Sequence, residues 1–196
     1  LGTIHQPGHC HPAWEPPSSR VVFPCHTRFL SACPANSNNQ STRNLHPNFD
    51  ASVFGISRSP VGYSNIAVHL KQSYAELLAS DQEHWGPEIP KWDQFDREVF
   101  EHPKTVGACV FLSWSEEQLV GFGSYDPRQR PEFGIVGHNC VLPDFRCRGF
   151  GKQQIQEILR RFHEMGIELA KVTTNDHPLC TPGQRMYTAC GFRETG

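Results

Sequence analysis

Five residues with chemical potential lie close together in the C-terminal half of the chain. Arg146, Arg148 and Lys152 carry positive charge, and Gly149 and Gly151 lack the Cβ that would keep a bulky ligand away from the backbone. An apolar strand pattern precedes this segment and a helical pattern follows it, so its amides would lie at a helix N-terminus. Such an end presents unpaired N–H groups and a partial positive charge. The segment therefore predicts an anion-binding loop of the kind that holds phosphate groups.

Two common phosphate-binding motifs do not fit this loop. A Walker loop requires a glycine five residues before Gly151, where the chain has Arg146, and Ser or Thr after Lys152, where it has Gln153. The dinucleotide fingerprint requires a third glycine at the position of Gln154. The pattern that remains is Arg-x-x-Gly-x-Gly. An ordinary strand, turn and helix with surface arginines would carry the same pattern, so the loop alone leaves both interpretations open.

A second motif follows the loop at some distance. Tyr187 and the pair Gly191-Phe192 form Tyr-x-x-x-Gly-Phe, after one amphipathic helical pattern and one further strand pattern. Together the loop and this motif resemble the GNAT family of N-acetyltransferases, in which the loop amides bind the pyrophosphate of CoA. The resemblance covers about residues 66–196 and is densest from 133 to 192. It implies an α/β fold of three layers, with a central mixed, mostly antiparallel sheet flanked by helices.

The resemblance also implies where acetyl-CoA would bind as co-substrate. Amides of the preceding strand would hold the pantetheine arm and polarise the thioester carbonyl, and amides of the loop would bind the pyrophosphate. The strand amides are those of Cys140, Val141 and Leu142, and the loop amides are those of Arg146, Cys147, Arg148, Gly149, Phe150, Gly151 and Lys152. Asn175, at the end of the next predicted strand, would add a further CoA contact.

Acetyl transfer to an amine needs groups that accept and donate protons. A lysine-like ammonium has a pKa of about 10.4 and has to lose a proton before it attacks the thioester. Tyr187 matches the family's tyrosine on the last helix and would donate to the departing CoA thiolate. Glu132 and His138 are the candidates for the general base, and the sequence does not choose between them. Each of the three has a structural alternative: Tyr187 as a core aromatic, Glu132 as a solvated turn residue and His138 as a packing histidine.

Hydrophobic periodicity predicts the elements that would position these residues. Helical stripes run from Ile66 to Leu78 and from Trp92 to Phe100, on either side of a break at Pro87–Pro90. This helix pair would form one wall of the acceptor site, with His84 and Trp85 as weaker contact candidates. The later elements are strands at 105–114, 119–125, 133–142 and 167–174, a helix from Gly151 to a capping Gly166, and a short helix at 182–189.

Both ends of the expected sheet are less clear. Ser52–Ile56 is the candidate for a first strand. The family usually adds two strands after its Gly-Phe pair, whereas only Arg193 to Gly196 follow here, so the domain is expected to be C-terminally incomplete. An open sheet edge costs stability and invites pairing. A second copy in a homodimer or the N-terminal segment could cover it.

Residues 1–60 differ from the rest of the chain. They are rich in Pro, Ser, Asn and His and predict an irregular or disordered extension, followed by an acetyltransferase domain at 61–196. An incorrectly assigned start, with the domain beginning near residue 60, is equally compatible. The region invites a metal interpretation, but its spacing fits no usual zinc pattern, so no metal is predicted. The residues concerned are His5, His9, Cys10, His11, Cys25, His26 and Cys33.

Composition and charge exclude several classes of protein. The formal net charge is −2, which gives no argument for nucleic-acid binding. No apolar run approaches the roughly 20 residues that span a bilayer, and the N-terminus lacks a signal-peptide pattern. The eight cysteines form no C-x-x-C pair and are expected to be reduced. These features predict a cytoplasmic protein without membrane or nucleic-acid partners.

The sequence thus favours an N-acetyltransferase that moves an acetyl group from acetyl-CoA to a primary amine by direct attack. The acceptor, a small molecule or a peptide, cannot be read from the sequence. A regulatory module that binds acyl-CoA without catalysis is the first alternative. A nucleotide or phosphate binder that uses the same loop is the second.

Overall fold

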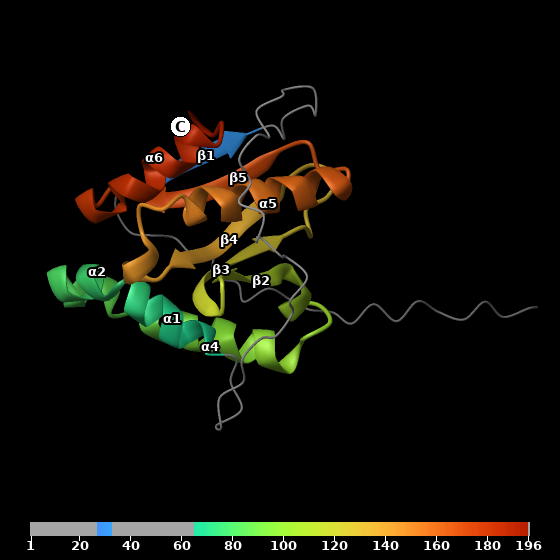
Figure 1. Ribbon diagram of the computed structural model, residues 1–196. Coiled ribbons are helices and arrows are strands. Elements are labelled where there is room, and N and C mark those ends of the chain that lie inside the picture. The colour runs from blue at the N-terminus through green and yellow to red at the C-terminus, as the bar shows by residue number, and fades with distance from the viewer. Residues whose placement is uncertain (1–26, 33–64, 196) are drawn as a thin grey trace, which may run out of the picture.

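A computed structural model describes residues 27–32 and 65–195 of the chain (Figure 1). The described helices, with short 3-10 turns marked η, are α1 (Ile66–Ser73), α2 (Ala75–Ser80), α3 (Gln82–Trp85), α4 (Glu88–Glu101), η1 (Gly107–Cys109), η2 (Pro143–Phe145), α5 (Phe150–Glu164), η3 (Pro178–Cys180) and α6 (Thr181–Ala189). The strands are β1 (Thr27–Ala32), β2 (Val110–Ser115), β3 (Gln118–Asp126), β4 (Gly134–Val141), β5 (Ala170–Asn175) and β6 (Arg193–Thr195). No described helix is long and apolar enough to cross a membrane.

The described strands form one mixed sheet in the order β2-β3-β4-β5-β1-β6. Neighbouring strands of the sheet run antiparallel, except β4 and β5, which run parallel. Figure 1 shows α1 and α4 together on one face of the sheet and α5 on the other. Three layers with a mostly antiparallel sheet confirm the fold class that the resemblance implied.

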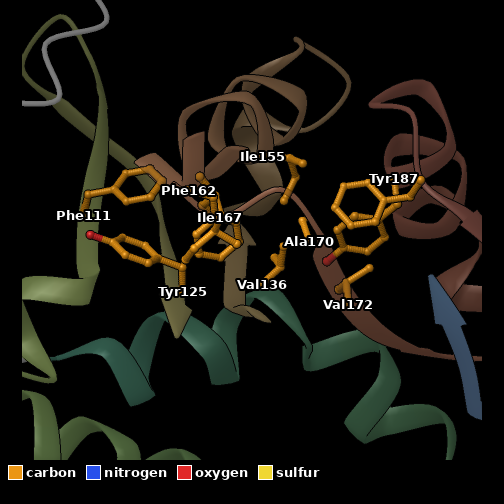
Figure 2. Close-up of a cluster of buried hydrophobic side chains, with 11 residues drawn as sticks. Phe111, Tyr125, Val136, Ile155, Phe162, Ile167, Ala170, Val172 and Tyr187 are labelled. Atoms are coloured by element: carbon orange, nitrogen blue, oxygen red, sulfur yellow. The ribbon is translucent and has the colours of Figure 1, made fainter. Parts of the chain in front are cut away.

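Each face of the sheet buries its own hydrophobic cluster. The α5 cluster includes Ile155, Ile158 and Phe162, all fully buried, and Figure 2 shows Tyr125 and Tyr187 at opposite ends of it. The α4 cluster joins residues of α1 and α4 to the other face of the strands: Ile66, Ala67, Leu70, Trp92, Val99, Val110, Leu112, Phe122 and Cys140. Together they hold the sheet between two helical layers.

Strand β1 comes from the N-terminal region for which irregular structure was expected. It pairs antiparallel with β5, from Thr27 opposite Asn175 to Ala32 opposite Ala170, and β6 pairs with its other edge. For these six residues the expectation was wrong, and the N-terminal segment covers the edge of β5. The candidate first strand at Ser52–Ile56 lies outside the described residues, and so do all of the candidate metal ligands. The domain boundary near residue 60 stays a prediction.

The N-terminal helical stripes fold with different boundaries from those predicted. The first stripe is divided at Tyr74 into α1 and α2. The second begins earlier than expected, because α4 starts at Glu88 and includes Pro90 in its first turn. Proline is tolerated there since the first amides of a helix have no acceptor within it. Likewise, the strand expected from residue 105 begins only at Val110, after η1.

The helix after the basic loop ends as predicted. Gly166 adopts φ 74°, the left-handed conformation that glycine allows. Its amide donates to the His163 carbonyl at 3.0 Å, and the Ile167 amide donates to the Phe162 carbonyl at 2.9 Å. This C-terminal cap returns the chain towards β5.

A bulge in β4 decides which side chains face which layer. Gly123 lies opposite Asn139 and Tyr125 opposite Val136, so Ser124 alone opposes Gly137 and His138. The Ser124 hydroxyl donates to the His138 carbonyl at 2.7 Å. Two residues of β4 therefore occupy the space of one.

The bulge exchanges the two faces of β4. Val136 and Cys140 are four residues apart and would share a face in a regular strand. Instead, Val136 packs in the α5 cluster and Cys140 in the α4 cluster. His138 packs against Phe95 of α4, with ring centroids 5.0 Å apart and the ring planes tilted by 58°. The bulge thus turns His138 towards the helix pair α1–α4.

Strands β4 and β5 pair only near their starts in the described structure. Gly134 lies opposite Ala170 and Ile135 opposite Lys171, and no later pair joins them within the described residues. The later residues of both strands instead line one cavity. The parting of two parallel strands therefore creates the space in which the candidate site lies.

A substitution at Gly134, where β4 begins, tests the close packing of this strand against α5. A Cβ at this position would lie 2.5 Å from ring atoms of the fully buried Phe162. We expect Gly134→Ala to lower the free energy of unfolding by about 1–3 kcal/mol through overpacking. Gly183→Ala, in α6 with no atom within 4 Å of the added Cβ, is the matched control and should be neutral or slightly stabilising. Equal urea midpoints for both variants would contradict the packing.

Candidate active site

A cavity of about 650 Å³ lies where β4 and β5 part. The C-terminal halves of both strands form its floor, and the loop into α5 closes one end. Side chains of α1, α2, α3 and α4 form one wall, and η3 and α6 form the other. A residue that acts on a ligand bound here has to line this cavity.

Asn139 joins the two walls of the cavity. Its side-chain oxygen accepts a hydrogen bond from the Tyr187 hydroxyl at 2.8 Å, and its carbonyl accepts one from the Tyr74 hydroxyl at 3.3 Å. Burial raises the pKa of both tyrosines above the ordinary value, so each hydroxyl keeps its proton at neutral pH. The floor of the cavity therefore carries two phenol donors, one from each layer.

The loop into α5 has the geometry of an anion cradle. Cys147 and Gly149 adopt φ 60° and 90°, and α5 begins at Phe150. The first amide that bonds back into the helix is that of Gln153, which donates to the Gly149 carbonyl at 3.1 Å. The earlier amides of this first turn have no acceptor within the helix, and the turn contains no acidic residue. They can bind phosphate oxygens.

The two glycines of the loop serve different purposes. Gly149 needs its left-handed φ, and a Cβ there would meet no atom within 4 Å. Gly151 has no such φ, but its Cβ would lie 2.7 Å from the Met186 sulfur of α6. The sequence assigned both glycines to close approach of a ligand. The structure instead gives Gly149 a conformational role and Gly151 a role in packing α5 against α6.

The loop cations do not all point towards the cradle. An Arg146 guanidinium nitrogen donates to the Ser73 carbonyl at the end of α1, and another lies 3.8 Å from the Glu76 carboxylate. Arg146 thus ties the loop to the helix pair, and the expected free positive charge is partly used. Arg148 lies over the Phe145 ring at 5.5 Å. Lys152 lines the cavity from the first turn of α5.

Only one of the three predicted strand amides faces the cavity. The Leu142 amide donates to the Val120 carbonyl at 2.8 Å and is used within the sheet. Cys140 lies opposite Phe122, two residues earlier in the same antiparallel ladder, so its amide also points to β3. The Val141 amide points the other way, towards the space between β4 and β5. The assignment of Cys140 and Leu142 amides to a ligand was therefore wrong.

Asn175 lines the cavity, but its polar atoms hold the turn that follows β5. Its side-chain oxygen accepts from the His177 amide at 2.7 Å, and its carbonyl accepts from the Gln184 side chain at 2.8 Å. These bonds fix η3 and α6 beside the cavity. A direct CoA contact from Asn175 stays a prediction.

The three catalytic candidates lie in different places. Tyr187 and His138 both line the cavity. Glu132 is exposed, in the turn before β4, and is absent from the cavity wall. Because it lies at the far end of the strand, Glu132 is too distant to serve as the base, and the expectation for this residue was wrong.

Burial weakens His138 as a proton acceptor. Removal from water, with a smaller contribution from the Lys91 charge, lowers the pKa of His138 to about 4. The imidazole is therefore neutral at pH 7 and can accept a hydrogen bond, but it holds a proton only weakly.

Sequence reasoning missed the residues that complete the helical wall. Ser73 donates to the Val141 carbonyl at 3.3 Å, and Tyr74 stacks on Trp92 with centroids 5.4 Å apart. Glu88 is only 7% exposed and also lines the cavity. The available signal was spacing, because Glu88 and Trp92 are four residues apart and share one face of α4. Trp85, a weak candidate, does line the cavity, whereas His84 only contacts its ring.

Comparison with known proteins places the chain in one family. A sequence model described as the Acetyltransferase (GNAT) family matches residues 71–192, more than half of the chain. No curated protein matches the chain by sequence similarity.

Solved structures agree in fold. A GNAT-family acetyltransferase from Colwellia psychrerythraea matches with a TM-score of 0.54 at 13% identity, over 86% of this chain and 53% of that one. The chain thus spans about half the length of that protein.

Two further structures match less of the chain. A putative GNAT-family acetyltransferase from Desulfovibrio desulfuricans matches with a TM-score of 0.49 at 19% identity, over 56% of this chain and 70% of that one. An aminoglycoside N-acetyltransferase solved in complex with CoA matches with a TM-score of 0.42 at 21% identity, over 57% of this chain and 89% of that one. With the family match over residues 71–192 and the observed fold, the chain belongs to the GNAT acetyltransferase family.

Proposed function

We propose that this chain is an N-acetyltransferase that uses acetyl-CoA and acetylates a primary amine by direct attack. One observation carries the proposal: the amide cradle at the start of α5 and the Tyr187–Asn139 pair open into the same cavity. An anion anchored by the cradle could therefore present its far end to a proton donor.

The donor site fits the groups that CoA carries. Acetyl-CoA would supply the acetyl group as an activated thioester. The loop amides from Cys147 to Lys152 would bind the pyrophosphate, and the Val141 amide would bind the pantetheine arm along the open side of β4. The Arg146 amide was also expected to contribute, but it donates to the Pro143 carbonyl at 3.2 Å. This assignment keeps the rest of the predicted loop and removes the amides that the protein itself uses.

Tyr187 is assigned to the leaving group. In the reaction the amine nitrogen bonds to the acetyl carbon, the carbon–sulfur bond breaks, and the sulfur leaves as a thiolate. Burial raises the pKa of the Tyr187 phenol, so it stays protonated. Its single O–H, which donates to the Asn139 side-chain oxygen at 2.8 Å, would turn to donate to that sulfur. The proton released by the amine would be taken up by neutral His138 and passed on to solvent. The lowered pKa of His138 makes it a weak acceptor that releases the proton readily.

Acetyl-CoA binding is tested with two glycines at opposite ends of α5. Gly149 and Gly166 both have positive φ, and an added Cβ meets no atom within 4 Å at either. We expect Gly149→Ala and Gly166→Ala each to lower stability by about 1 kcal/mol. Only Gly149→Ala should weaken acetyl-CoA binding, by tenfold or more in calorimetry, since it alone lies in the cradle. Equal affinities, or tighter binding of ATP than of acetyl-CoA by the unmodified chain, would contradict the donor site.

Catalysis is tested by removing the Tyr187 hydroxyl. We expect Tyr187→Phe to lower kcat by about 10²-fold or more, the range of a lost proton donor, with acetyl-CoA affinity retained. Tyr125→Phe is the matched control, because Tyr125 is a buried tyrosine at the other end of the same cluster and outside the cavity lining. Acetyl-CoA binding without transfer to any amine would favour the regulatory module instead.

The lowered pKa of His138, which is partly buried, predicts a pH dependence of stability. Its folded pKa, about 4, lies below the unfolded value of about 6.5, so the unfolded chain binds the proton more readily. The stability from neutral His138 is complete above pH 6.5 and is lost as the pH falls towards 4. Between pH 7 and pH 5 the unmodified chain should lose about 2 kcal/mol more than His138→Gln in urea unfolding. Equal losses would show that His138 is solvated.

A further inference from the structure

We propose that Glu88 and the aromatic face of α4 bind the acceptor, and that the acceptor is a primary amine with a single positive charge on an apolar or aromatic body. This inference rests on the proposed function and names the substrate class of the same cavity.

The first step is the position of Glu88. It lies in the first turn of α4, is 7% exposed and lines the cavity. The other carboxylate of the lining, Glu76, has a side chain that is 74% exposed and lies beside Arg146. Glu88 is thus the buried carboxylate of the cavity lining, and it lies on α4, a different element from the anion cradle at the start of α5.

The second step is the surface that joins Glu88 to the reaction centre. Glu88 and Trp92 are four residues apart on one face of α4, and both line the cavity. Trp92 stacks on Tyr74, which also lines the cavity and whose hydroxyl donates to the Asn139 carbonyl. A ligand whose charged end met Glu88 would therefore lie along the rings of Trp92 and Tyr74.

The third step is the chemistry that this surface recognises. Aromatic faces attract cations and cover apolar groups, and a buried carboxylate requires a positive partner. The wall near Glu88 is completed by Leu77 and Trp85, which offer little to a molecule rich in hydroxyls or charges. One buried carboxylate matches one ammonium, so a monoamine fits better than a polyamine or an amino sugar.

Lys91 is the present partner of Glu88. Its ammonium lies 2.6 Å from a Glu88 oxygen, and its side chain is 38% exposed. An incoming ammonium would compete with Lys91 for the carboxylate. This competition separates a binding role from a structural salt bridge, because the two predict different effects when Lys91 is removed.

Kinetics with acetyl-CoA test the assignment on the full chain. Phenethylamine, an aromatic monoamine, should show a KM at least tenfold lower than those of spermidine and kanamycin. Glu88→Gln should raise the KM for phenethylamine tenfold or more with kcat within about threefold, and Lys91→Gln should lower that KM. Glu83→Gln, an exposed carboxylate of α3 outside the cavity lining, is the control and should leave both constants unchanged. The inference would be overturned if KM changed in the same direction in the Glu88 and Lys91 variants. It would also be overturned if the enzyme preferred spermidine or kanamycin to phenethylamine.

A binding experiment decides the point even if Glu88→Gln fails to fold. Calorimetry of the unmodified chain with CoA should show phenethylamine binding at least tenfold more tightly than the uncharged phenethyl alcohol. Equal affinities would overturn the charge recognition. Because this comparison needs no turnover, it reports on the amine pocket separately from acetyl-CoA binding, whose absence would count against the proposed function instead.

Discussion

The bulge at Gly137 and His138 is the constraint on which the site depends. It allows β4 to present Val136 to one hydrophobic cluster and Cys140 to the other, although their spacing would place them together. The same inserted residue turns His138 to the α4 wall and leaves Asn139 to meet Tyr187 of α6. Ser124 stabilises the bulge through its 2.7 Å bond to the His138 carbonyl. A regular strand would place these side chains on the wrong sides of the sheet.

The cavity lining assigns opposite charge to different elements. At the start of α5 the unpaired amides and the partial charge of the helix N-terminus favour an anion, and no acid in the first turn opposes them. On α4, Glu88 is buried in a lining that includes Trp85 and Trp92. An anionic donor and a cationic acceptor would therefore be held by different elements and could meet near Asn139. This follows from the positions of α4 and α5 in different layers of the fold.

The sequence predicted the parts of this arrangement that depend on local patterns. The basic loop, the stripe of α5 and the Gly166 cap follow from patterns within one segment, whereas Tyr187 came from the resemblance of its motif to the family's. The bulge does not follow from a local pattern, because Gly137-His138 reads like part of a regular strand. It becomes visible only when β4 pairs with β3 and Ser124 lies opposite these two residues. Glu88 was missed because a single acidic residue in a helix reads as a solvated one, and only the fold buries it in the cavity lining. Glu132 was selected because it is close in sequence to the residues of the site. An extended strand separates residues that are close in sequence, so Glu132 lies far from the cavity.

Several polar side chains of the cavity lining already bond within the protein, which places ligand recognition on the backbone. Arg146 donates to the Ser73 carbonyl of α1, Asn175 accepts from the His177 amide, and Asn139 accepts from two tyrosines. The loop amides from Cys147 to Lys152 remain available, and every residue type except proline supplies the same amide. A donor site of the proposed kind would require the left-handed Gly149 and the strand geometry more than particular side chains. Acceptor choice, under the same proposal, would rest on side chains such as Glu88, where no backbone group can substitute.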